Sequence, residues 1–493
     1  MTGVDVVVVG AGSAGCVMAA RLAESPSRSV LLLEAGPDLR SRPDPAMHDG
    51  WRMWREHGWG FESEPDARGV SSPLHRGRVV GGTSWMTRFA MRGSPADFAE
   101  WERLGNPGWG YDAVLPYFNR LETDLDFGDD AWHGDAGPIP VTRYPDIVAT
   151  DYETTLAAAM TAAGFDAIDD HNRPGAVGYS RMPRSARRGA RVTTADAYLP
   201  VGGTPGNLTI RADAQVADIV FDGDSASGVR LLDGTVLTAS QVVLCAGTYG
   251  SPAILMRSGI GPARHLGEVG VPVRIDLPGV GERLSDHSAP DIELGYRGDF
   301  REAPVMHSFA TFHSSSTDPS DAPDLGLWLA EPFGEPKRGY IDVVLLKPAS
   351  RGRVRLRSAH PAAAPRIELP GLREQVDIDR LCEAFARASE VAHDPAVRGL
   401  CAELPTPSPE SPEEIRAAVL ANTGSVPHVV GTCAMGPSPD GGAVVDTAGS
   451  VYGVRGLAVA DASVIPIAPS GFSQLITIMV AERLAQKPVP TVS

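Results

Sequence analysis

The sequence predicts an α/β fold of two domains, of which the first contains a parallel sheet and the second is discontinuous and of α+β type. Three observations support this prediction. The chain opens with an apolar strand, a helix of small residues and a second apolar strand. Residues 241–247 and 456–461 have the composition of strands that are buried on both faces. At 493 residues the chain also exceeds the size at which one hydrophobic core usually suffices.

The first 36 residues form a β-α-β pattern with closely spaced glycines after its first strand. Four valines precede Gly10, Gly12 and Gly15, which let the chain turn tightly, approach a pyrophosphate and pack a helix on the strand. Glu34 follows Gly15 by 19 residues, at the end of the second strand, where an acceptor for an adenosine ribose hydroxyl is expected. The pattern predicts a Rossmann-like domain that binds a dinucleotide. The alternative is a glycine-rich turn in an ordinary β-α-β unit.

The following segments leave this sheet before the chain returns to it. Glycine and proline break regular structure between residues 36 and 45. Residues 77–84 (GRVVGGTS) are expected to form a loop that leads into a helix N-terminus, because such sequences leave backbone N–H groups free to face a ligand. Residues 112–122 have helical spacing. The acidic stretch 123–137 is interpreted as a surface loop with solvated charges.

From residue 207 the pattern changes to short β-rich runs at residues 208–211, 216–221 and 228–232, with Asp-Gly turns after the last two. These runs predict a meander that is inserted before the next core strand. That strand is residues 241–247, whose apolar composition and terminal glycine place it back in the nucleotide-binding sheet.

The remaining chain divides into a middle region and a C-terminal part. Residues 288–427 mix strands with proline-rich joints and a helix near 376–392. Because they contain no dinucleotide fingerprint, they are the candidate for a substrate-facing domain. Residues 456–461 form the last apolar strand, and residues 473–486 have apolar positions at helical spacing.

The formal net charge of −17 opposes binding to phosphate backbones and to anionic membrane surfaces. Nucleic acid is therefore not an expected partner. The local basic segment 184–191 is short and lacks interleaved aromatic residues. It is interpreted as a solvated or cofactor-covering loop.

Membrane insertion, disulfides and metal sites are not expected either. No uninterrupted apolar run reaches the roughly 18 residues that span a bilayer, and the first strand begins without a charged, cleavable leader, so a cytoplasmic location is predicted. The five cysteines are scattered without metal-ligand spacing. His133 and His313 lack neighbours at such spacing as well, so no metal is predicted.

Four further segments carry a resemblance to a known family. Residues 247–261 (GTYGSPAILMRSGIG) are the most specific, and residues 191–199 (RVTTADAYL), 279–287 (GVGERLSDH) and 428–436 (HVVGTCAMG) accompany them. They resemble the glucose–methanol–choline (GMC) oxidoreductases, which are FAD-dependent, over nearly the whole chain. The resemblance implies an FAD-binding domain of residues 1–145, 188–290 and 440–493, and a substrate-binding domain of residues 146–187 and 291–439.

In this family FAD lies extended, and the resemblance implies a set of cofactor-binding positions. They are Gly10, Gly12 and Gly15 at the pyrophosphate, Glu34 at the ribose, the backbone of Val216 at the adenine, Gly81, Gly82, Thr83 and Ser84 along the flavin, Asp461 at the ribityl chain, and also Ser13, Ala246 and Gly247. The start of the final helix would meet the pyrimidine end. A helix N-terminus there stabilises the negative charge that arrives with a hydride at N5.

The first signature of the family is imperfect in this chain. The usual asparagine or histidine position is Thr87, and one residue is missing before Arg92. Family members that tether FAD covalently use a histidine in this segment, and residues 85–87 contain none. Non-covalent FAD is therefore predicted.

Oxidation of an alcohol by a flavin requires loss of the hydroxyl proton and transfer of a hydride from the same carbon. Histidine is suited to accept the proton because its pKa lies near neutral pH. The resemblance assigns this role to His428, which otherwise would be a satisfied core histidine. The family's second active-site residue, three positions before Thr477, is Gln474. Its amide is expected to orient the alkoxide in a single-base mechanism, with Ser473 as the weaker candidate.

The predicted function is oxidation of a primary or secondary alcohol to a carbonyl, by an oxidase or dehydrogenase that passes electrons to O2 or another acceptor. Two alternatives stay open: a lyase on the same scaffold with non-redox FAD, and a flavin-containing electron-transfer or binding protein whose alcohol chemistry has decayed at Gln474. Asp286 and His287 follow a glycine-rich loop and are interpreted as structural.

Overall fold

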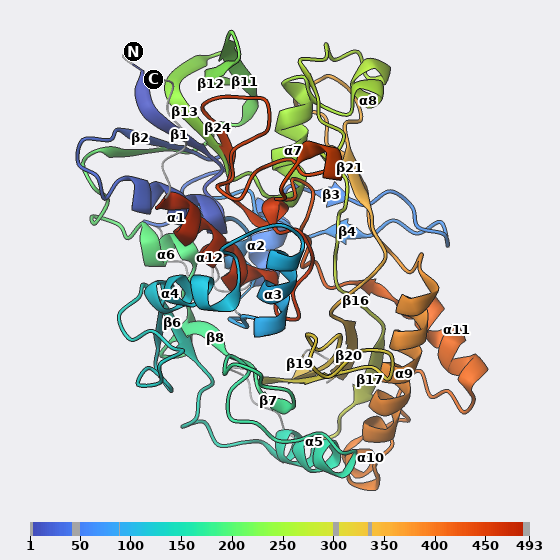
Figure 1. Cartoon of the computed structure of the whole chain (residues 1–493). Coiled ribbons are helices and arrows are strands. Elements are labelled where there is room, and N and C mark those ends of the chain that lie inside the picture. The colour runs from blue at the N-terminus through green and yellow to red at the C-terminus, as the bar shows by residue number, and fades with distance from the viewer. Residues whose placement is uncertain (1–2, 42–49, 88, 299–304, 334–337, 487–493) are drawn as a thin grey trace.

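The structure, a computed structural model, describes residues 3–41, 50–87, 89–298, 305–333 and 338–486. Its elements gather around two large sheets, one in the upper and one in the lower half of Figure 1. Strands from the start of the chain lie in the upper sheet, whereas strands from the middle of the chain make up most of the lower one.

The upper sheet contains five parallel strands in the order β10-β2-β1-β13-β24. Their bounds are β1 (Val4–Val9), β2 (Val30–Leu33), β10 (Leu208–Arg211), β13 (Val236–Leu244) and β24 (Leu457–Val459). The four valines at the end of β1 are buried, as expected for a strand covered on both faces. This confirms the predicted β-α-β unit and both later core strands.

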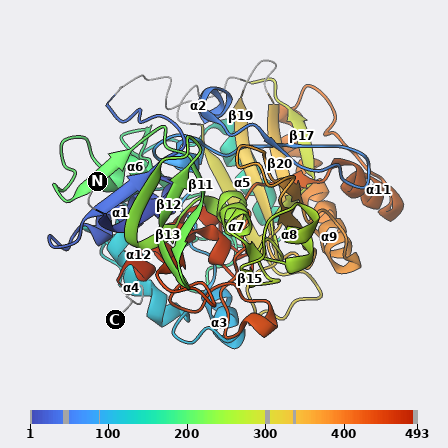
Figure 2. The ribbon, with the colours of Figure 1, turned by 90° about the horizontal axis from the view of Figure 1, so that it is seen from above.

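Helices cover both faces of this sheet. α1 (Ser13–Leu22) connects β1 to β2 and packs against α12 (Ser473–Ala485) and against the short α6 (Thr194–Tyr198). α7 (Gly247–Arg257) follows β13 directly. Seen from above in Figure 2, α1 and α12 lie on one side of β13 and α7 on the other.

The predicted meander is present but is not a separate insertion. β11 (Val216–Asp222), β12 (Ser225–Leu231) and the first residues of β13 pair antiparallel, whereas the second half of β13 pairs with β1. The long strand β13 therefore belongs both to the parallel sheet and to the antiparallel meander. β10, which the sequence placed in the meander, instead pairs parallel to β2 at the edge of the core sheet.

The lower sheet is antiparallel, and the order of its main strands is β23-β16-β20-β19-β18-β7, with β17 also paired to β20. The bounds are β7 (Tyr179–Arg181), β16 (Ser288–Ala289), β17 (Asp291–Gly295), β18 (His307–Phe312), β19 (Leu325–Phe333), β20 (Arg338–Leu345) and β23 (Gly424–Ser425). The predicted substrate-facing region thus forms a sheet of its own. The predicted domain boundaries stay a prediction.

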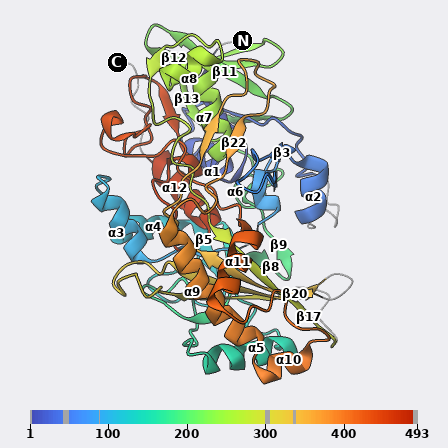
Figure 3. The same ribbon diagram turned by 90° about the vertical axis from the view of Figure 1, so that its right-hand side faces the viewer.

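Alternation along β20 separates the two faces of the lower sheet. Ile341 and Val343 are buried in a core that contains side chains of α5 (Asp151–Ala162) and α9 (Gln375–Ala392). Figure 3 shows α5 and α10 (Pro395–Leu400) at the end of the molecule away from the parallel sheet, with α9 running alongside the lower sheet. The opposite face of the lower sheet is turned toward the parallel-sheet half.

Shorter elements connect and flank the two sheets. On the N-terminal side they are α2 (Gly50–His57), β3 (Phe61–Glu62), β4 (Pro73–Leu74), η2 (Gly82–Trp85), α3 (Pro95–Arg103), α4 (Tyr111–Leu121), β5 (Glu122–Asp124), β6 (Ile139–Thr142), β8 (Arg184–Arg187) and β9 (Ala190–Arg191). Farther along the chain they are β14 (Ile260–Gly261), α8 (Ala263–Glu268), β15 (Ile275–Asp276), β21 (Arg353–Arg355), β22 (Arg366–Glu368), α11 (Pro412–Asn422), η3 (Pro439–Gly441) and η4 (Ala462–Val464). The helices predicted near 112–122, 376–392 and 473–486 are confirmed.

The acidic stretch 123–137 is mostly loop, but the expectation that its charges are solvated is wrong for Asp124. This side chain is fully buried and accepts hydrogen bonds from Arg143 at 2.6 and 2.8 Å. Arg143 also binds Asp170 at 2.6 Å. The stretch is therefore held by an internal ion-pair network whose members lie far apart in the sequence.

His133 also has neighbours that its sequence spacing did not indicate. Its Nδ1 lies 2.8 Å from Glu122 Oε1 and 3.1 Å from Asp124 Oδ2. The three side chains could in principle hold a cation. However, Glu122 pairs with Arg92 and Asp124 with Arg143. These two guanidinium groups already balance the carboxylates, so we assign the cluster to the ion-pair network.

The basic segment 184–191, expected to be a solvated or cofactor-covering loop, forms a hairpin of β8 and β9. Arg184 and Arg191 are buried, whereas Arg187 and Arg188 are exposed. No helix in the described part of the chain is long and apolar enough to cross a membrane.

Candidate active site

A cavity of about 1120 Å³ lies between the two sheets and is lined by residues from both. Val9 and Val216 contribute from the parallel-sheet half, and His307, Trp328 and Asp342 from the lower sheet. Ligand pockets usually measure roughly 300–1,000 Å³. The cavity therefore has room for an extended cofactor together with a small substrate.

The turn between β1 and α1 borders this cavity. Gly10 has a φ of +95°, and a Cβ on Gly15 would approach the carbonyl oxygen of Gly10 to 1.8 Å. Gly12 lines the cavity, and a Cβ there would meet nothing within 4 Å. No side chain caps the N-terminus of α1, so its first N–H groups are free to bind a phosphate. Gly10, Gly12 and Ser13 line the cavity, whereas Gly15 packs behind the turn.

Glu34 lies in the cavity wall at the end of β2 and fixes this turn. Its Oε2 accepts a hydrogen bond from the Ala11 N–H at 2.9 Å, and its Oε1 accepts one from the Gly36 N–H at 2.9 Å. Burial raises the pKa of Glu34 to about 7. Each oxygen keeps a further lone pair, which is what a ribose hydroxyl would need.

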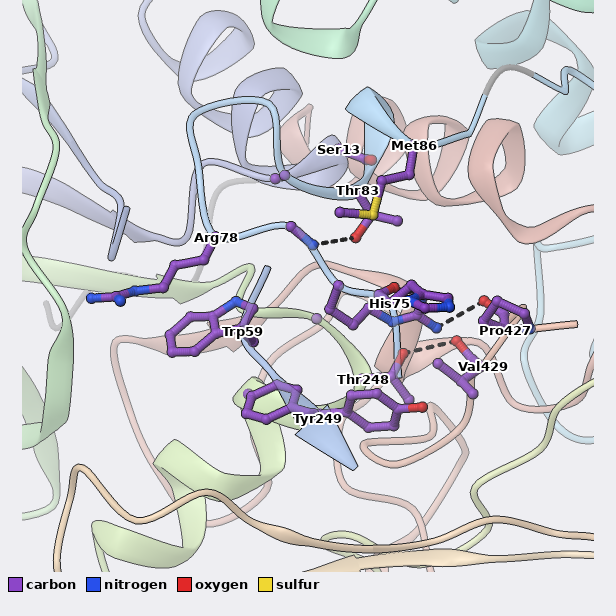
Figure 4. A pocket seen from close by; sticks show the side chains of 18 of the residues that line it. Ser13, Trp59, His75, Arg78, Thr83, Met86, Thr248, Tyr249, Pro427 and Val429 are labelled. Atoms are coloured by element: carbon purple, nitrogen blue, oxygen red, sulfur yellow. Dashed lines mark hydrogen bonds between the residues drawn. The ribbon is translucent and has the colours of Figure 1, made fainter. Parts of the chain in front are cut away.

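The loop 77–84 leads into the short 3-10 helix η2, as its glycines predicted. Gly81 and Gly82 have φ values of +101° and +52°, and a Cβ on Gly82 would approach the Cα of Gly12 to 2.7 Å. Gly82 and Thr83 line the cavity. Figure 4 shows Thr83 accepting a hydrogen bond, which comes from the Gly77 N–H at 3.3 Å.

Ser84 and Gly81 lie behind this loop rather than in the cavity wall. The Ser84 hydroxyl donates to the Gly81 carbonyl at 2.6 Å and accepts from the Thr194 N–H at 3.1 Å. Thr87 does line the cavity. Gly82, Thr83 and Thr87 therefore form the edge of the loop that faces the cavity, and Gly81 and Ser84 form the edge that supports it.

The turn between β13 and α7 forms another part of the wall through Ala246 and Gly247. Asp461, just after β24, holds this turn: its Oδ2 accepts from the Gly247 N–H at 2.8 Å and from the Ser251 hydroxyl at 2.6 Å. Its Oδ1 accepts from the Ser463 N–H at 2.8 Å. Burial raises the pKa of Asp461, and these donors oppose that rise. Asp461 lines the cavity, but its carboxylate is occupied by the protein.

Gln474, in the first turn of α12, has partners on the cofactor side of the cavity. Its Oε1 accepts from the Ser13 hydroxyl at 3.0 Å, and its Nε2 donates to the Thr194 hydroxyl at 3.4 Å. No hydrogen bond of the described residues joins it to His428. The role of Gln474 toward a substrate stays a prediction. No side chain caps the N-terminus of α12.

His428 lines the cavity and is held by the segment 285–287. The Asp286 Oδ1 accepts from the His428 backbone N–H at 2.7 Å, and Asp286 also accepts from the Ser425 hydroxyl. The Nδ1 atoms of His287 and His428 are 3.0 Å apart. The Nε2 of His287 lies 3.0 Å from the carbonyl oxygen of Pro469. Asp286 and His287 thus contact the predicted base directly, which their position in the sequence did not indicate.

These partners assign the tautomers of both rings. A carbonyl oxygen only accepts, so the Nε2 of His287 carries a proton and donates to Pro469. Burial lowers the pKa of His287 to about 4, so its Nδ1 is a bare acceptor at neutral pH. His428 therefore donates its Nδ1–H to His287. This leaves the Nε2 of His428 with a lone pair and no protein partner among the described residues.

Burial lowers the pKa of His428 well below its ordinary value, and nearby His287 and Arg76 act in the same direction. Arg76 is held at this place by a bond from its guanidinium to the Pro427 carbonyl oxygen at 2.8 Å. Pro427 and Val429, on either side of His428 in sequence, are labelled in Figure 4, where Thr248 donates to the Val429 carbonyl at 2.8 Å.

An aromatic cluster reaches His428 through Phe472, and the sequence reasoning missed it. The ring of Phe472 lies 4.2 Å from that of His428, centroid to centroid. Phe472 in turn contacts Trp328 at 5.5 Å and Phe89 at 5.7 Å. The side chain that packs on His428 before the final helix is therefore Phe472, two residues before Gln474. The prediction for Gln474 concerned a contact with the substrate, which this packing of Phe472 does not test.

The fold and the site together define a nucleotide-binding oxidoreductase with a histidine facing its cavity. Comparison with known families identifies the class. The GMC oxidoreductase family matches in two parts, its N-terminal part over residues 4–289 and its C-terminal part over residues 348–481. The chain belongs to the GMC oxidoreductase family, and it is an FAD-dependent oxidoreductase of the type that acts on alcohols.

Individual relatives match over nearly the whole chain. A 5-(hydroxymethyl)furfural oxidase of Methylovorus sp. (strain MP688) is 34% identical, covering 98% of both chains. An oxygen-dependent choline dehydrogenase 1 of Chromohalobacter salexigens is 33% identical, covering 98% of this chain and 94% of the relative. The crystal structure of pyridoxine 4-oxidase from Mesorbium loti is similar with a TM-score of 0.90 at 29% identity, covering 98% of both chains.

The cavity fits the cofactor of this family. The positive φ values and tight approaches at Gly10, Gly15 and Gly82 make two turns that a larger residue would disrupt, and both turns border the cavity. Of the predicted cofactor residues, those in the cavity wall are Gly10, Gly12, Ser13, Glu34, Gly82, Thr83, Val216, Ala246, Gly247 and Asp461.

Proposed function

We propose that this enzyme oxidises a primary or secondary alcohol to a carbonyl with His428 as its single base. The observation that carries the proposal is that His428 lines the cavity while its Nδ1–H is bound by His287, which leaves its Nε2 with a lone pair and no protein partner among the described residues. FAD, when bound, supplies the acceptor for the hydride that leaves the alcohol carbon.

The role of His428 is to remove the hydroxyl proton. Its Nε2 accepts this proton, and the Nδ1–H···Nδ1 contact with His287 holds the ring in the tautomer that leaves Nε2 able to accept it. Gln474 keeps one N–H and one carbonyl lone pair beyond its bonds to Ser13 and Thr194, and with these it would orient the substrate oxygen. The uncapped N-terminus of α12 would stabilise negative charge on the cofactor.

For the cofactor we propose an extended placement. Its pyrophosphate would bind at Gly12 and the N-terminus of α1, its adenosine ribose at Glu34 and its adenine at the backbone of Val216. Support comes from the fact that these positions line one continuous cavity, which also reaches Thr83 and His428.

Anaerobic mixing of the holoenzyme with a panel of alcohols tests this function. Loss of the visible flavin absorbance with at least one primary or secondary alcohol is expected. A lyase would convert its substrate without bleaching the flavin. An electron-transfer protein would be reduced by dithionite but by no alcohol. Repeating the experiment with O2 identifies an oxidase by prompt return of the absorbance.

The pH dependence of flavin reduction reports the ionisation of His428. Because burial, His287 and Arg76 lower its pKa well below 6.5, the base stays neutral and active at neutral pH. We expect the anaerobic reduction rate to be constant above pH 6.5 and to fall only in more acidic solution. A rate that still rises between pH 7 and 9 would contradict the assignment of this histidine as the base.

The FAD is expected to be bound without a covalent link. Residues 85–87 contain no histidine, and the cavity-facing side chain at the expected tether position is Thr87. Precipitation of the protein with acid should release the yellow chromophore into the supernatant. Flavin that remains with the pellet after washing would show a covalent bond.

A further inference from the structure

A buried ion pair holds the chain on both sides of Pro469, whose carbonyl oxygen ends the hydrogen-bond chain from the proposed base. The Nζ of Lys347 lies 2.8 Å from the Oδ1 of Asp97, and the two side chains are 12% and 0% exposed. The same Nζ donates to the carbonyl oxygen of Ala468 at 2.8 Å. The Oδ2 of Asp97 accepts from the Ser470 N–H at 2.9 Å and from the Ser470 hydroxyl. Both neighbours of Pro469 are therefore bound by one ion pair.

This ion pair joins three segments that are far apart in the sequence. Lys347 lies just after the end of β20 in the lower sheet, and Asp97 lies in the first turn of α3. The segment 468–471 precedes α12. It also packs closely on the chain before α3, because a Cβ on Gly471 would approach the backbone nitrogen of Gly93 to 2.3 Å. The segment therefore has little room to shift while the ion pair is intact.

The stability of the fold alone does not explain a buried lysine at this place. Burying an ion pair costs desolvation free energy that often equals its Coulombic gain, so an apolar pair would serve stability as well. The ammonium group of Lys347 also contacts Glu100 at 2.9 Å, but no hydrogen bond of the described residues joins Glu100 to the segment 468–471. Asp97 is thus the acid that connects the lysine to this segment.

We infer that Lys347 and Asp97 are positioning residues for the base His428. The inference rests on the proposed function and names two residues that this function requires. They place the Pro469 carbonyl oxygen, which keeps a proton on the Nε2 of His287 and leaves its Nδ1 to accept from His428. Neither Lys347 nor Asp97 lines the cavity, so both act through this chain of hydrogen bonds and not on the substrate.

A displaced Pro469 carbonyl would remove what fixes the His287 ring. His287 could then carry its proton on Nδ1 and direct it at the Nδ1 of His428. The proton of His428 would in that case lie on Nε2, the atom that has to accept the hydroxyl proton of the substrate. The alcohol would still bind, because the cavity wall is unchanged. We therefore expect a loss in the chemical step and not in binding.

Lys347→Met keeps the length of the side chain and removes its charge and its donors. With the best alcohol of the panel, the limiting rate of anaerobic flavin reduction should fall by about 10- to 100-fold, since small displacements of a base have effects of this size. The alcohol concentration that gives half of the limiting rate should stay within about two-fold of the wild-type value.

The pH profile provides a readout that a general loss of structure would not move. Burial is the main reason why the pKa of His287 is low; the positive charge of Lys347 lowers it further, and the charge of Asp97 acts in the opposite direction. Without the lysine, His287 takes up its second proton at a higher pH, and its Nδ1–H then opposes the tautomer that His428 needs. The acidic fall of the reduction rate should begin at a higher pH in Lys347→Met than in the wild type.

Two further variants separate positioning from folding. Glu100→Gln alters the other acid beside Lys347 and should leave the limiting rate within about two-fold, because a partly exposed ion pair contributes little. Ser470→Ala removes one hydroxyl that donates to Asp97 and should lower the limiting rate by about 3- to 10-fold with the half-saturating concentration unchanged. It carries the prediction if Lys347→Met does not retain FAD. FAD content and the thermal unfolding midpoint check that each variant is folded.

The outcomes distinguish the positioning role from the proposed function. In Lys347→Met, a limiting rate within about three-fold of wild type, a half-saturating concentration that rises as much as the rate falls, or an unmoved acidic fall would each overturn the positioning role. Alcohol oxidation would then still stand. If no alcohol of the panel reduces the flavin of the wild type, the proposed function fails, and the positioning role fails with it.

Discussion

Replacing His428 with alanine is expected to lower the rate of anaerobic flavin reduction by about 10²- to 10⁴-fold, the usual contribution of a positioned base. His428 lines the cavity, and because its Nδ1–H is bound by His287 its Nε2 keeps a lone pair that can accept a proton. Rapid mixing with the best alcohol of the panel measures the effect, and the flavin absorbance before mixing confirms that FAD is bound.

Two comparisons make this prediction specific. His171→Ala removes another buried histidine. The Nε2 of His171 lies 3.0 Å from the carbonyl oxygen of Phe309 in β18, and His171 does not line the cavity. It should leave the rate within a few-fold once FAD content is corrected. Added imidazole should restore part of the activity of His428→Ala. A near-wild-type rate in His428→Ala would disprove its role as base.

Replacing Arg143 with alanine is expected to destabilise the protein by about 3–5 kcal/mol. Arg143 binds two buried carboxylates, Asp124 and Asp170, each at 2.6 Å, and its side chain is 6% exposed. Its removal leaves both acids without their cation in a place that water does not reach. Urea unfolding of the FAD-saturated protein, followed by tryptophan fluorescence, measures the loss of free energy of unfolding.

An exposed ion pair provides the matched comparison. Arg264 binds Glu268 at 3.0 Å, but the two side chains are 93% and 56% exposed. Arg264→Ala should therefore change the free energy of unfolding by less than about 1 kcal/mol. Equal effects of the two arginine variants would show that the buried network contributes no more than a surface pair.

The pH dependence of this network has a defined sign. Although burial opposes it, the hydrogen bond from His133 and the charge of Arg143 hold the pKa of Asp170 well below its ordinary value. Because the carboxyl ionises more easily in the folded state, its contribution to stability is present at neutral pH and is lost on acidification. The difference between wild type and Arg143→Ala should therefore shrink in strongly acidic solution.

Local patterns were sufficient to predict the parallel sheet. The apolar composition of the run Val6–Val9 and of the later core strands is enough to predict that they are buried. The glycines that follow Val9 predict the turn into the first helix. The helix around α12 was equally visible. These elements are defined by neighbours in sequence, which is why a single sequence revealed them.

The residues that pack around His428 could not be predicted from local sequence patterns. Phe472 is the N-cap residue of α12, with extended backbone at φ −86° and ψ 137°, so its side chain leaves the helix and packs on His428. Gln474, in the first turn of the helix, bonds to Ser13 instead. Counting residues cannot distinguish these directions, because they depend on where the helix begins.

Long-range ion pairs explain the other differences. Asp124 looks like a surface acid in its own segment, and its burial depends on Arg143 and on Arg92 beside Glu122. Likewise, Asp342 has an unremarkable place in the sequence. Only the pairing of β20 with β17 and β19 puts it between Asp291 and Trp328.

The contact between His287 and His428 also determines where a proton can go. The chain of hydrogen bonds runs from His428 through His287 and ends at the Pro469 carbonyl, which has no proton to exchange and is no base at neutral pH. The route into the protein interior is therefore closed. A proton taken up at the Nε2 of His428 must return through the cavity itself, so the base is reset for the next turnover only when product and solvent exchange there.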